Sequence, residues 1–121
     1  MINYEEKLNK LLDKISGSVL VSIVGTDGMG LAHVKKDDSI DIEKMDADVT
    51  SIILNSDKVA KSRDKGNLME MFFTTGYSTY IIIPINELYF VYLIVEGENQ
   101  NLGLARYELH KTVGEIEESL K

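Results

Sequence analysis

The chain has 121 residues, of which 13 are basic and 20 acidic, so its net charge is −7. This acidic balance argues against non-specific binding to nucleic acid or to an anionic lipid surface, because both need a positive footprint. The absence of cysteine excludes disulfides and thiolate chemistry. Hydrophobic residues make up 44% of the sequence, enough for the core of one domain, which we expect to span residues 1–121.

The longest apolar run, residues 88–95, is far too short to cross a bilayer. The N-terminus carries Glu5 and Glu6 where a signal peptide would need positive charge. We therefore expect a cytoplasmic protein.

The first predicted element is an amphipathic helix. Apolar residues recur at helical spacing at Leu8, Leu11, Leu12 and Ile15. Asn3 is suited to cap this helix, and Gly17 is suited to end it. Residues 18–24 are rich in β-branched side chains, and a turn at residues 25–28 joins them to a second short strand at residues 29–35, so a hairpin is predicted.

Helical spacing returns over residues 42–65. The apolar face of this second helix carries Met45, Val49, Ile52, Ile53 and Val59. Its last turns hold the only dense basic patch of the chain, which includes Lys58, Lys61 and Arg63. Two interpretations stay open: a solvated face that complements the helix dipole, or a docking surface for an acidic partner. We take these three residues as candidate partner contacts.

Three strands are predicted next, at residues 68–75, 77–85 and 87–96. Gly76 and Asn86 mark the turns between them, which favours an antiparallel meander. The last of these strands is continuously apolar, so we expect helices on both faces of the sheet. A final helix is predicted over residues 101–120, and Asn101 is suited to cap it. The whole order of elements indicates an α+β fold.

No pattern typical of a catalytic site is present. His33 and His110 are the only histidines, and neither has a second ligand at metal-site spacing. Gly25, Gly28 and Gly30 lie between two strands and match neither a P-loop nor a dinucleotide-binding motif. We expect no catalytic residue, no cofactor, no metal and no enzyme activity.

The informative feature is the first strand of the meander, which we expect at the edge of the sheet. Residues 66–105 contain no lysine or arginine, and an apolar edge strand without lysine or proline is a template for strand addition. A segment of the same chain could cover it, but we favour a second copy. The expected dimer contacts are Ile52, Val59, Met69, Met71 and Phe73. The sequence does not decide which alternate side chains of this strand face the second helix and which face the first and last helices.

The order of elements, together with three stretches, resembles the roadblock/LC7 family and, within it, the MglB-like regulators of Ras-like GTPases. The stretches are the first hairpin at residues 19–32, the strands at residues 80–85 and 88–95, and the segment Asn-Leu-Gly-Leu-Ala-Arg-Tyr-Glu-Leu at residues 101–109. The resemblance implies a profilin-like, five-stranded antiparallel sheet of order 2-1-5-4-3. It places the first and last helices on one face and the second helix on the other.

The resemblance also implies a function. The resemblance implies a non-enzymatic homodimer, in which the third strands and the second helices of the two copies meet. This homodimer would act as a regulator or scaffold for a small Ras-like GTPase. MglB-like members stimulate GTP hydrolysis by repositioning the switch residues of the GTPase itself. The alternative is a small-ligand sensor of profilin-like or PAS-like architecture, which predicts an apolar pocket between sheet and helix.

Overall fold

A computed structural model describes all of residues 1–121. Its three α-helices are α1 (Tyr4–Asp13), α2 (Ile42–Lys61) and α3 (Leu102–Ile116), the last followed by a short 3-10 turn, η1 (Glu117–Leu120). Its five strands are β1 (Ser18–Gly25), β2 (Gly30–Lys35), β3 (Met71–Thr74), β4 (Ser78–Pro84) and β5 (Tyr89–Glu96). None of the helices combines the length and apolar composition that crossing a bilayer requires.

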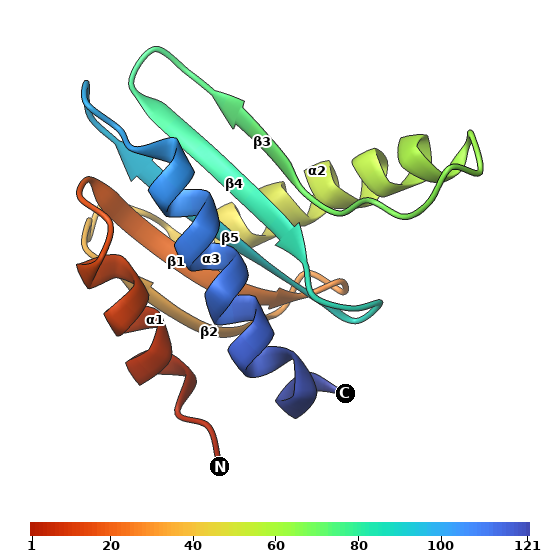
Figure 1. The fold of residues 1–121 in the computed structure, drawn as a ribbon, viewed down its shortest axis with the longest axis horizontal. Helices are drawn as coiled ribbons and strands as arrows, with labels where there is room; N and C mark the ends of the chain where they lie inside the picture. The colour runs from red at the N-terminus through yellow and green to blue at the C-terminus, as the bar shows by residue number, and fades with distance from the viewer.

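The strands form one antiparallel sheet of order β2-β1-β5-β4-β3 (Figure 1). This confirms the predicted order of elements and the predicted sheet. The central strand, β5, pairs with β1 on one side and β4 on the other. The edges of the sheet are therefore β2 and β3.

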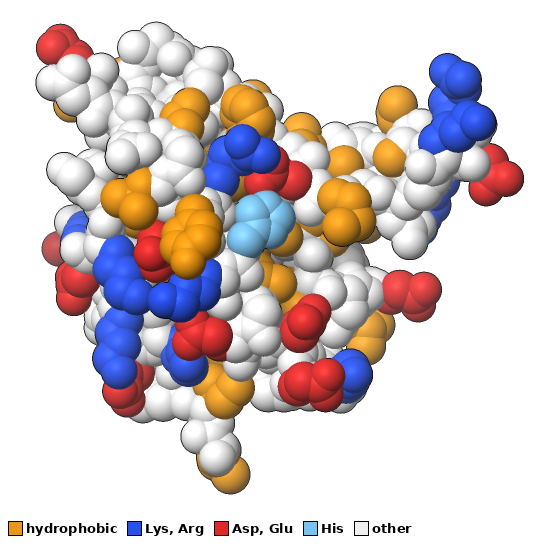
Figure 2. Space-filling model, in the orientation of Figure 1, with side chains coloured by type: hydrophobic (Ala, Val, Ile, Leu, Met, Phe, Trp, Pro, Cys, Tyr) orange, Lys and Arg blue, Asp and Glu red, His pale blue; other side chains and the backbone are white.

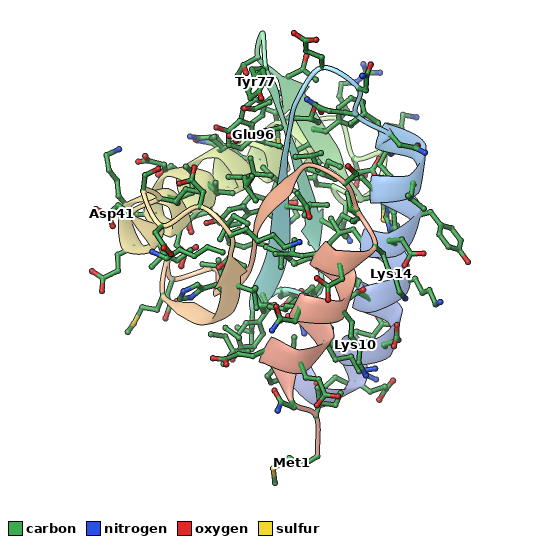
Figure 3. The ribbon with its side chains drawn as sticks, turned by 90° about the vertical axis from the view of Figure 1, so that its left-hand side faces the viewer. Met1, Lys10, Lys14, Asp41, Tyr77 and Glu96 are labelled. Atoms are coloured by element: carbon green, nitrogen blue, oxygen red, sulfur yellow. The ribbon has the colours of Figure 1, made fainter.

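The two faces of the sheet carry separate apolar cores. A core of 16 residues joins α1 and α3 to one face, and a core of 8 residues joins α2 to the other. Figure 3 shows this layering, with α2 on one side of the sheet and the other two helices opposite. Strand β5 contributes alternate side chains to both cores, which explains its continuous apolar run.

Side-chain caps fix where the helices begin. The Oδ1 atoms of Asn3, Asp41 and Asn101 each accept a hydrogen bond from the backbone N–H three residues later, at 3.1, 3.3 and 3.0 Å. These bonds satisfy donors that have no partner inside the helix. The caps predicted at Asn3 and Asn101 are confirmed.

The prediction for the second helix was too long at its C-terminal end. The helix ends at Lys61 rather than residue 65, and Ser62 Oγ donates to the carbonyl of Val59 at 2.7 Å. Asp64 then adopts a left-handed backbone with φ of 52°, which cannot continue a right-handed helix. In Figure 1 this end of α2 projects beyond the sheet, and Val59 is accordingly 70% exposed.

The prediction for the edge strand, residues 68–75, was also too long, since β3 covers only Met71–Thr74. The reason lies in the neighbouring strand. The ladder pairs Met71 with Ile82, and the same register would bring residue 69 opposite Pro84. Thr75 N–H donates to the carbonyl of Ser78 at 2.8 Å. Every second residue counted back from Thr75, which includes Met69, would therefore direct its backbone N–H and C=O groups toward β4. Proline has no N–H to donate, and the ladder stops.

Candidate protein interaction surface

The outer side of β3 is an unpaired sheet edge, which we call the β3 edge (Met71–Thr74). Met71 and Phe73 direct their backbone groups toward β4, so those of Phe72 and Thr74 point outward. Met71 and Phe73 are half-buried against the α2 core, whereas Phe72 lies toward the α3 side and is 46% exposed. The structure thereby decides which alternating set faces which layer.

The five residues predicted as dimer contacts fall into two groups. Ile52, Met71 and Phe73 all pack against the same α2 core and are half-buried. Met69 is 76% exposed on the segment before β3, and Val59 is exposed on the projecting part of α2. The first group forms one surface beside the β3 edge, and the second group extends it past the end of the sheet.

The predicted basic patch forms the tip of the projecting α2 end. Figure 2 shows lysine and arginine side chains gathered there. Lys61 Nζ pairs with Asp57 Oδ2 at 2.8 Å, and this hydrogen bond raises the pKa of Lys61. Lys58 and Arg63 are exposed and take part in no ion pair. Both are therefore available to an acidic partner.

A buried carboxylate that the sequence reasoning missed attaches α2 to the sheet. Asp46 is only 4% exposed, and its Oδ1 accepts hydrogen bonds from Ser22 Oγ at 2.9 Å and from the Tyr92 hydroxyl at 2.6 Å. Ser22 and Tyr92 are register partners on β1 and β5. Burial, followed by the bond to Asp46, raises the pKa of Tyr92. The sequence did contain a signal for this burial, because Asp46 lies at helical spacing from the apolar residues Val49 and Ile53 and so shares their buried face.

A second cluster joins the segment before β3 to α3. Glu70 Oε1 accepts from Arg106 Nε at 2.9 Å and from Nη2 at 2.6 Å, and Glu70 Oε2 lies 2.7 Å from His110 Nε2. The Arg106 guanidinium, and then His110, lower the pKa of Glu70 against the opposing effect of burial. Arg106 also lies 5.7 Å from the centre of the Phe72 ring, within cation–π range. Arg106 and His110 thus position the edge of the sheet.

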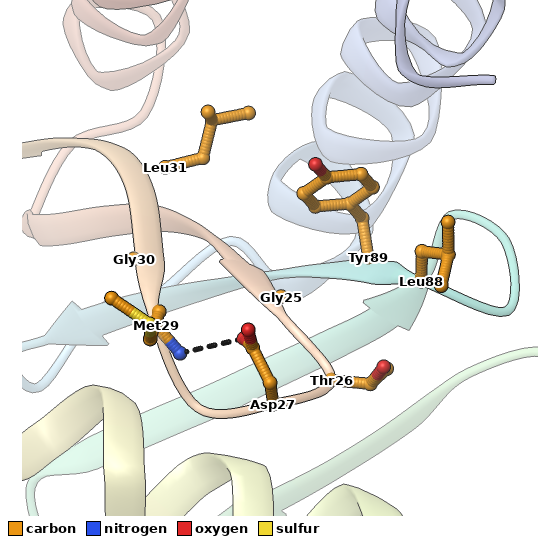
Figure 4. A pocket seen from close by; sticks show the side chains of 8 residues that line it. All are labelled: Gly25, Thr26, Asp27, Met29, Gly30, Leu31, Leu88 and Tyr89. Carbon is orange, nitrogen blue, oxygen red and sulfur yellow. Dashed lines mark hydrogen bonds between the residues drawn. The ribbon is translucent and has the colours of Figure 1, made fainter.

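Two hollows lie at the end of the sheet where the turns β1–β2 and β4–β5 meet. The smaller, about 330 Å³, is lined by both turns. Figure 4 shows Met29, Leu31, Leu88 and Tyr89 around it, with Asp27 Oδ1 accepting from Met29 N–H at 3.0 Å. The larger, about 820 Å³, is a groove between the end of α2, the segment before β3, the end of β4 and α3.

Known proteins share this architecture. A family model described as mitogen-activated protein kinase kinase 1 interacting matches residues 2–121. The Ragulator complex protein LAMTOR3 homolog of Drosophila melanogaster is 27% identical over 114 residues, which cover 92% of this chain and 87% of that protein.

Solved structures agree on the fold. Myxococcus xanthus MglB superposes with a TM-score of 0.87 at 14% identity, covering 96% of this chain and 93% of that one. A Roadblock/LC7 domain from Streptomyces avermitilis gives 0.85 at 13% identity, covering 96% of each. The chain belongs to the mitogen-activated protein kinase kinase 1 interacting family and has the roadblock/LC7 fold.

Proposed function

We propose that this chain is a non-enzymatic, homodimeric regulator or scaffold that binds a small Ras-like GTPase. The β3 edge is the observation that carries the proposal. It is an unpaired strand with no charge and no proline, and half-buried apolar side chains lie beside it. Such an edge promotes association unless it is covered.

A second copy of the chain is the cover that fits best. Two β3 edges related by a two-fold axis would pair their outward backbone groups and join the sheets into one. Ile52, Met71 and Phe73 would become buried, while Val59 and Met69 would reach across to the partner. Residues that are half-buried in one copy would then be fully buried in the pair.

The charge along α2 supports pairing with an identical chain. The helix begins near Asp41, Glu43 and Asp48 and ends near Lys58 and Arg63. Two antiparallel helices would bring the basic end of each near the acidic start of the other, so the charges would attract along the seam.

Lys58, Lys61 and Arg63 are the proposed contacts to the GTPase, at the tip of α2 that projects beyond the sheet. The relatives support a partner of this class, because MglB is a structural neighbour and the Drosophila relative is described as a Ragulator complex protein. We assign no catalytic residue to this chain. Any acceleration of GTP hydrolysis would act by repositioning the switch residues of the GTPase.

The test combines mass and nucleotide-dependent binding. Light scattering should give the mass of a dimer, and a pull-down from lysate of the source cell, run with GDP and with a non-hydrolysable GTP analogue, should retain a Ras-like GTPase preferentially with one nucleotide. The double variant Lys58→Glu, Arg63→Glu should lose this retention. A matched variant, Lys10→Glu with Lys111→Glu, makes the same charge change away from α2 and should retain the GTPase. Retention of no GTPase under either nucleotide would contradict the proposal.

A further inference from the structure

The groove of about 820 Å³ lies where the chain leaves α2 and approaches β3. We call residues 66–70 the arm. Apolar side chains from three elements line the groove, and they include Leu54 of α2, Leu68 of the arm and Ile85 just after β4. Leu54 is 48% exposed, so this floor presents apolar surface to solvent. In Figure 2 a hollow separates the projecting tip from the body of the molecule.

The backbone of the arm is unpaired beside this apolar floor. Residues 65–70 neither donate nor accept any backbone–backbone hydrogen bond within the chain. The ladder with β4 has stopped at Met71 because Pro84 cannot donate to Met69. Open backbone donors and acceptors are what strand addition requires, and alternate side chains of an added strand would enter the apolar floor.

The charges of the groove favour a basic ligand. Its cations are already engaged, since Lys61 pairs with Asp57 and His110 with Glu70. Glu87 and Glu117 also line the groove, are exposed and take part in no ion pair. Lysine or arginine on a ligand would neutralise these two carboxylates.

We propose that this groove binds an extended peptide segment of a partner protein, which adds as a strand along the arm. The segment alternates apolar side chains and carries at least one lysine or arginine to meet Glu87 and Glu117. At about 3.3 Å per residue, the four residues of the arm after Gly66 can pair with a segment of similar length. The site is distinct from the β3 edge, because the groove lies between the arm, β4 and α3, whereas the edge faces outward.

The first experiment uses a displayed library of ten-residue peptides in which apolar positions alternate with random ones. Sequences enriched on the wild-type chain should carry lysine or arginine. The enriched peptide, synthesised with a fluorescent label, should bind at least about tenfold more weakly to Glu87→Lys with Glu117→Lys, as expected for the loss of two charge contacts. Leu54→Gln, a change at an exposed helical position, should also weaken binding.

The matched control is Glu5→Lys with Glu98→Lys, which makes the same change in net charge at two exposed glutamates outside the groove. Its binding should stay within about twofold of the wild type, because remote charges are screened. Equal weakening in both double variants would show only non-specific attraction to an acidic protein and would overturn the proposal.

The strand-addition step has its own test. The same peptide N-methylated at alternate residues keeps its side chains but loses backbone donors, and it should bind at least about tenfold more weakly. Unchanged binding of the methylated peptide would overturn the proposal that the peptide adds as a strand. Failure to enrich any peptide, with a change in mass by light scattering for Leu54→Gln, would assign the groove to a second copy and overturn the proposal. Neither result would bear on retention of a GTPase.

Discussion

The two faces of the sheet differ in how completely they are covered. On the α1/α3 face, 16 buried residues form one apolar core that includes side chains from both helices and from strands β1, β4 and β5, with half-buried side chains of β2 at its margin. On the α2 face the buried core has 8 residues, and Met45, Ile52, Met71 and Phe73 at its border stay half-buried. Half-buried side chains also border the larger core, but that core has twice as many fully buried residues. In the proposed dimer, the half-buried border of the α2 face would gain further burial from the partner.

The buried polar side chains on the two faces differ in kind. Those beside α1 and α3 are the hydroxyls of Ser18, Thr79 and Thr112. On the other face, α2 rests on the sheet through the buried carboxylate of Asp46, with Ser22 and Tyr92 as donors. Hydrogen bonds have directional geometry, and apolar contacts do not. We infer that the larger core supplies most of the stability, while the Asp46 cluster sets the position of the helix that borders the β3 edge.

The largest effect is expected at the β3 edge. Met71→Arg would bury an unpaired charge at the seam of the proposed dimer, which costs about 3–5 kcal/mol of association free energy, so light scattering should show a monomer at micromolar concentration. The matched control is His33→Arg on the opposite edge strand, β2, where the side chain is exposed. A Met71→Arg protein that stays dimeric and equally stable would show that the β3 edge is not the seam.

The α1/α3 face should respond in the opposite way. Leu109→Ala removes a fully buried side chain of α3 and should lower the free energy of unfolding by about 3 kcal/mol, from lost burial and the cavity it leaves. The folded mass should not change. Urea denaturation at fixed protein concentration measures the first quantity and light scattering the second. A monomeric Leu109→Ala protein would contradict the assignment of separate roles to the two faces.

Local patterns in the sequence were sufficient to predict the elements and their order. The helical spacing from Leu8 to Ile15, the caps at Asn3 and Asn101 and the unbroken apolar run of β5 are all signals within a few residues of the structure they specify. The length of β3 is not set by a local signal of this kind. It depends on Pro84, which lies in another strand and acts only through the register of the ladder.

The same distinction applies to the site. The apolar edge and the basic tip could be predicted because each is a run of neighbouring residues. The contacts of Asp46 with Tyr92 and of Glu70 with Arg106 join residues 46 and 36 positions apart. No spacing within one element indicates that Arg106 and His110 would meet a glutamate of the arm, so their structural role became evident only in the folded chain.

The role given to the buried carboxylate is tested next. Asp46→Ala leaves the hydroxyls of Ser22 and Tyr92 without their acceptor and should lower the free energy of unfolding by about 2 kcal/mol. In a Tyr92→Phe background the same change should cost about 1 kcal/mol less, because the two residues share one hydrogen bond. Urea denaturation of the four proteins gives this coupling. Strictly additive effects would mean that the Asp46–Tyr92 bond does not help to hold α2.

The smallest effect concerns the arm, which borders both the β3 edge and the groove. The pKa of Glu70 is lowered, mainly by Arg106, from an ordinary value of 4.5. A lowered pKa means that the stabilisation is complete above about pH 4.5 and is lost as the pH falls through the lower pKa of the folded state.

Glu70→Gln should therefore cost about 1 kcal/mol at pH 7, the upper range for a partly exposed ion pair. The difference from the wild type should shrink as the pH is lowered below 4.5, because Glu70 is then protonated first in the unfolded chain and, at still lower pH, in the folded chain as well. Glu5→Gln, an exposed glutamate without an ion pair, should change stability little at either pH. Urea denaturation at pH 7 and at pH 3 distinguishes these outcomes. A penalty for Glu70→Gln that stays constant with pH would show that Glu70 holds the arm through its shape and not through its charge.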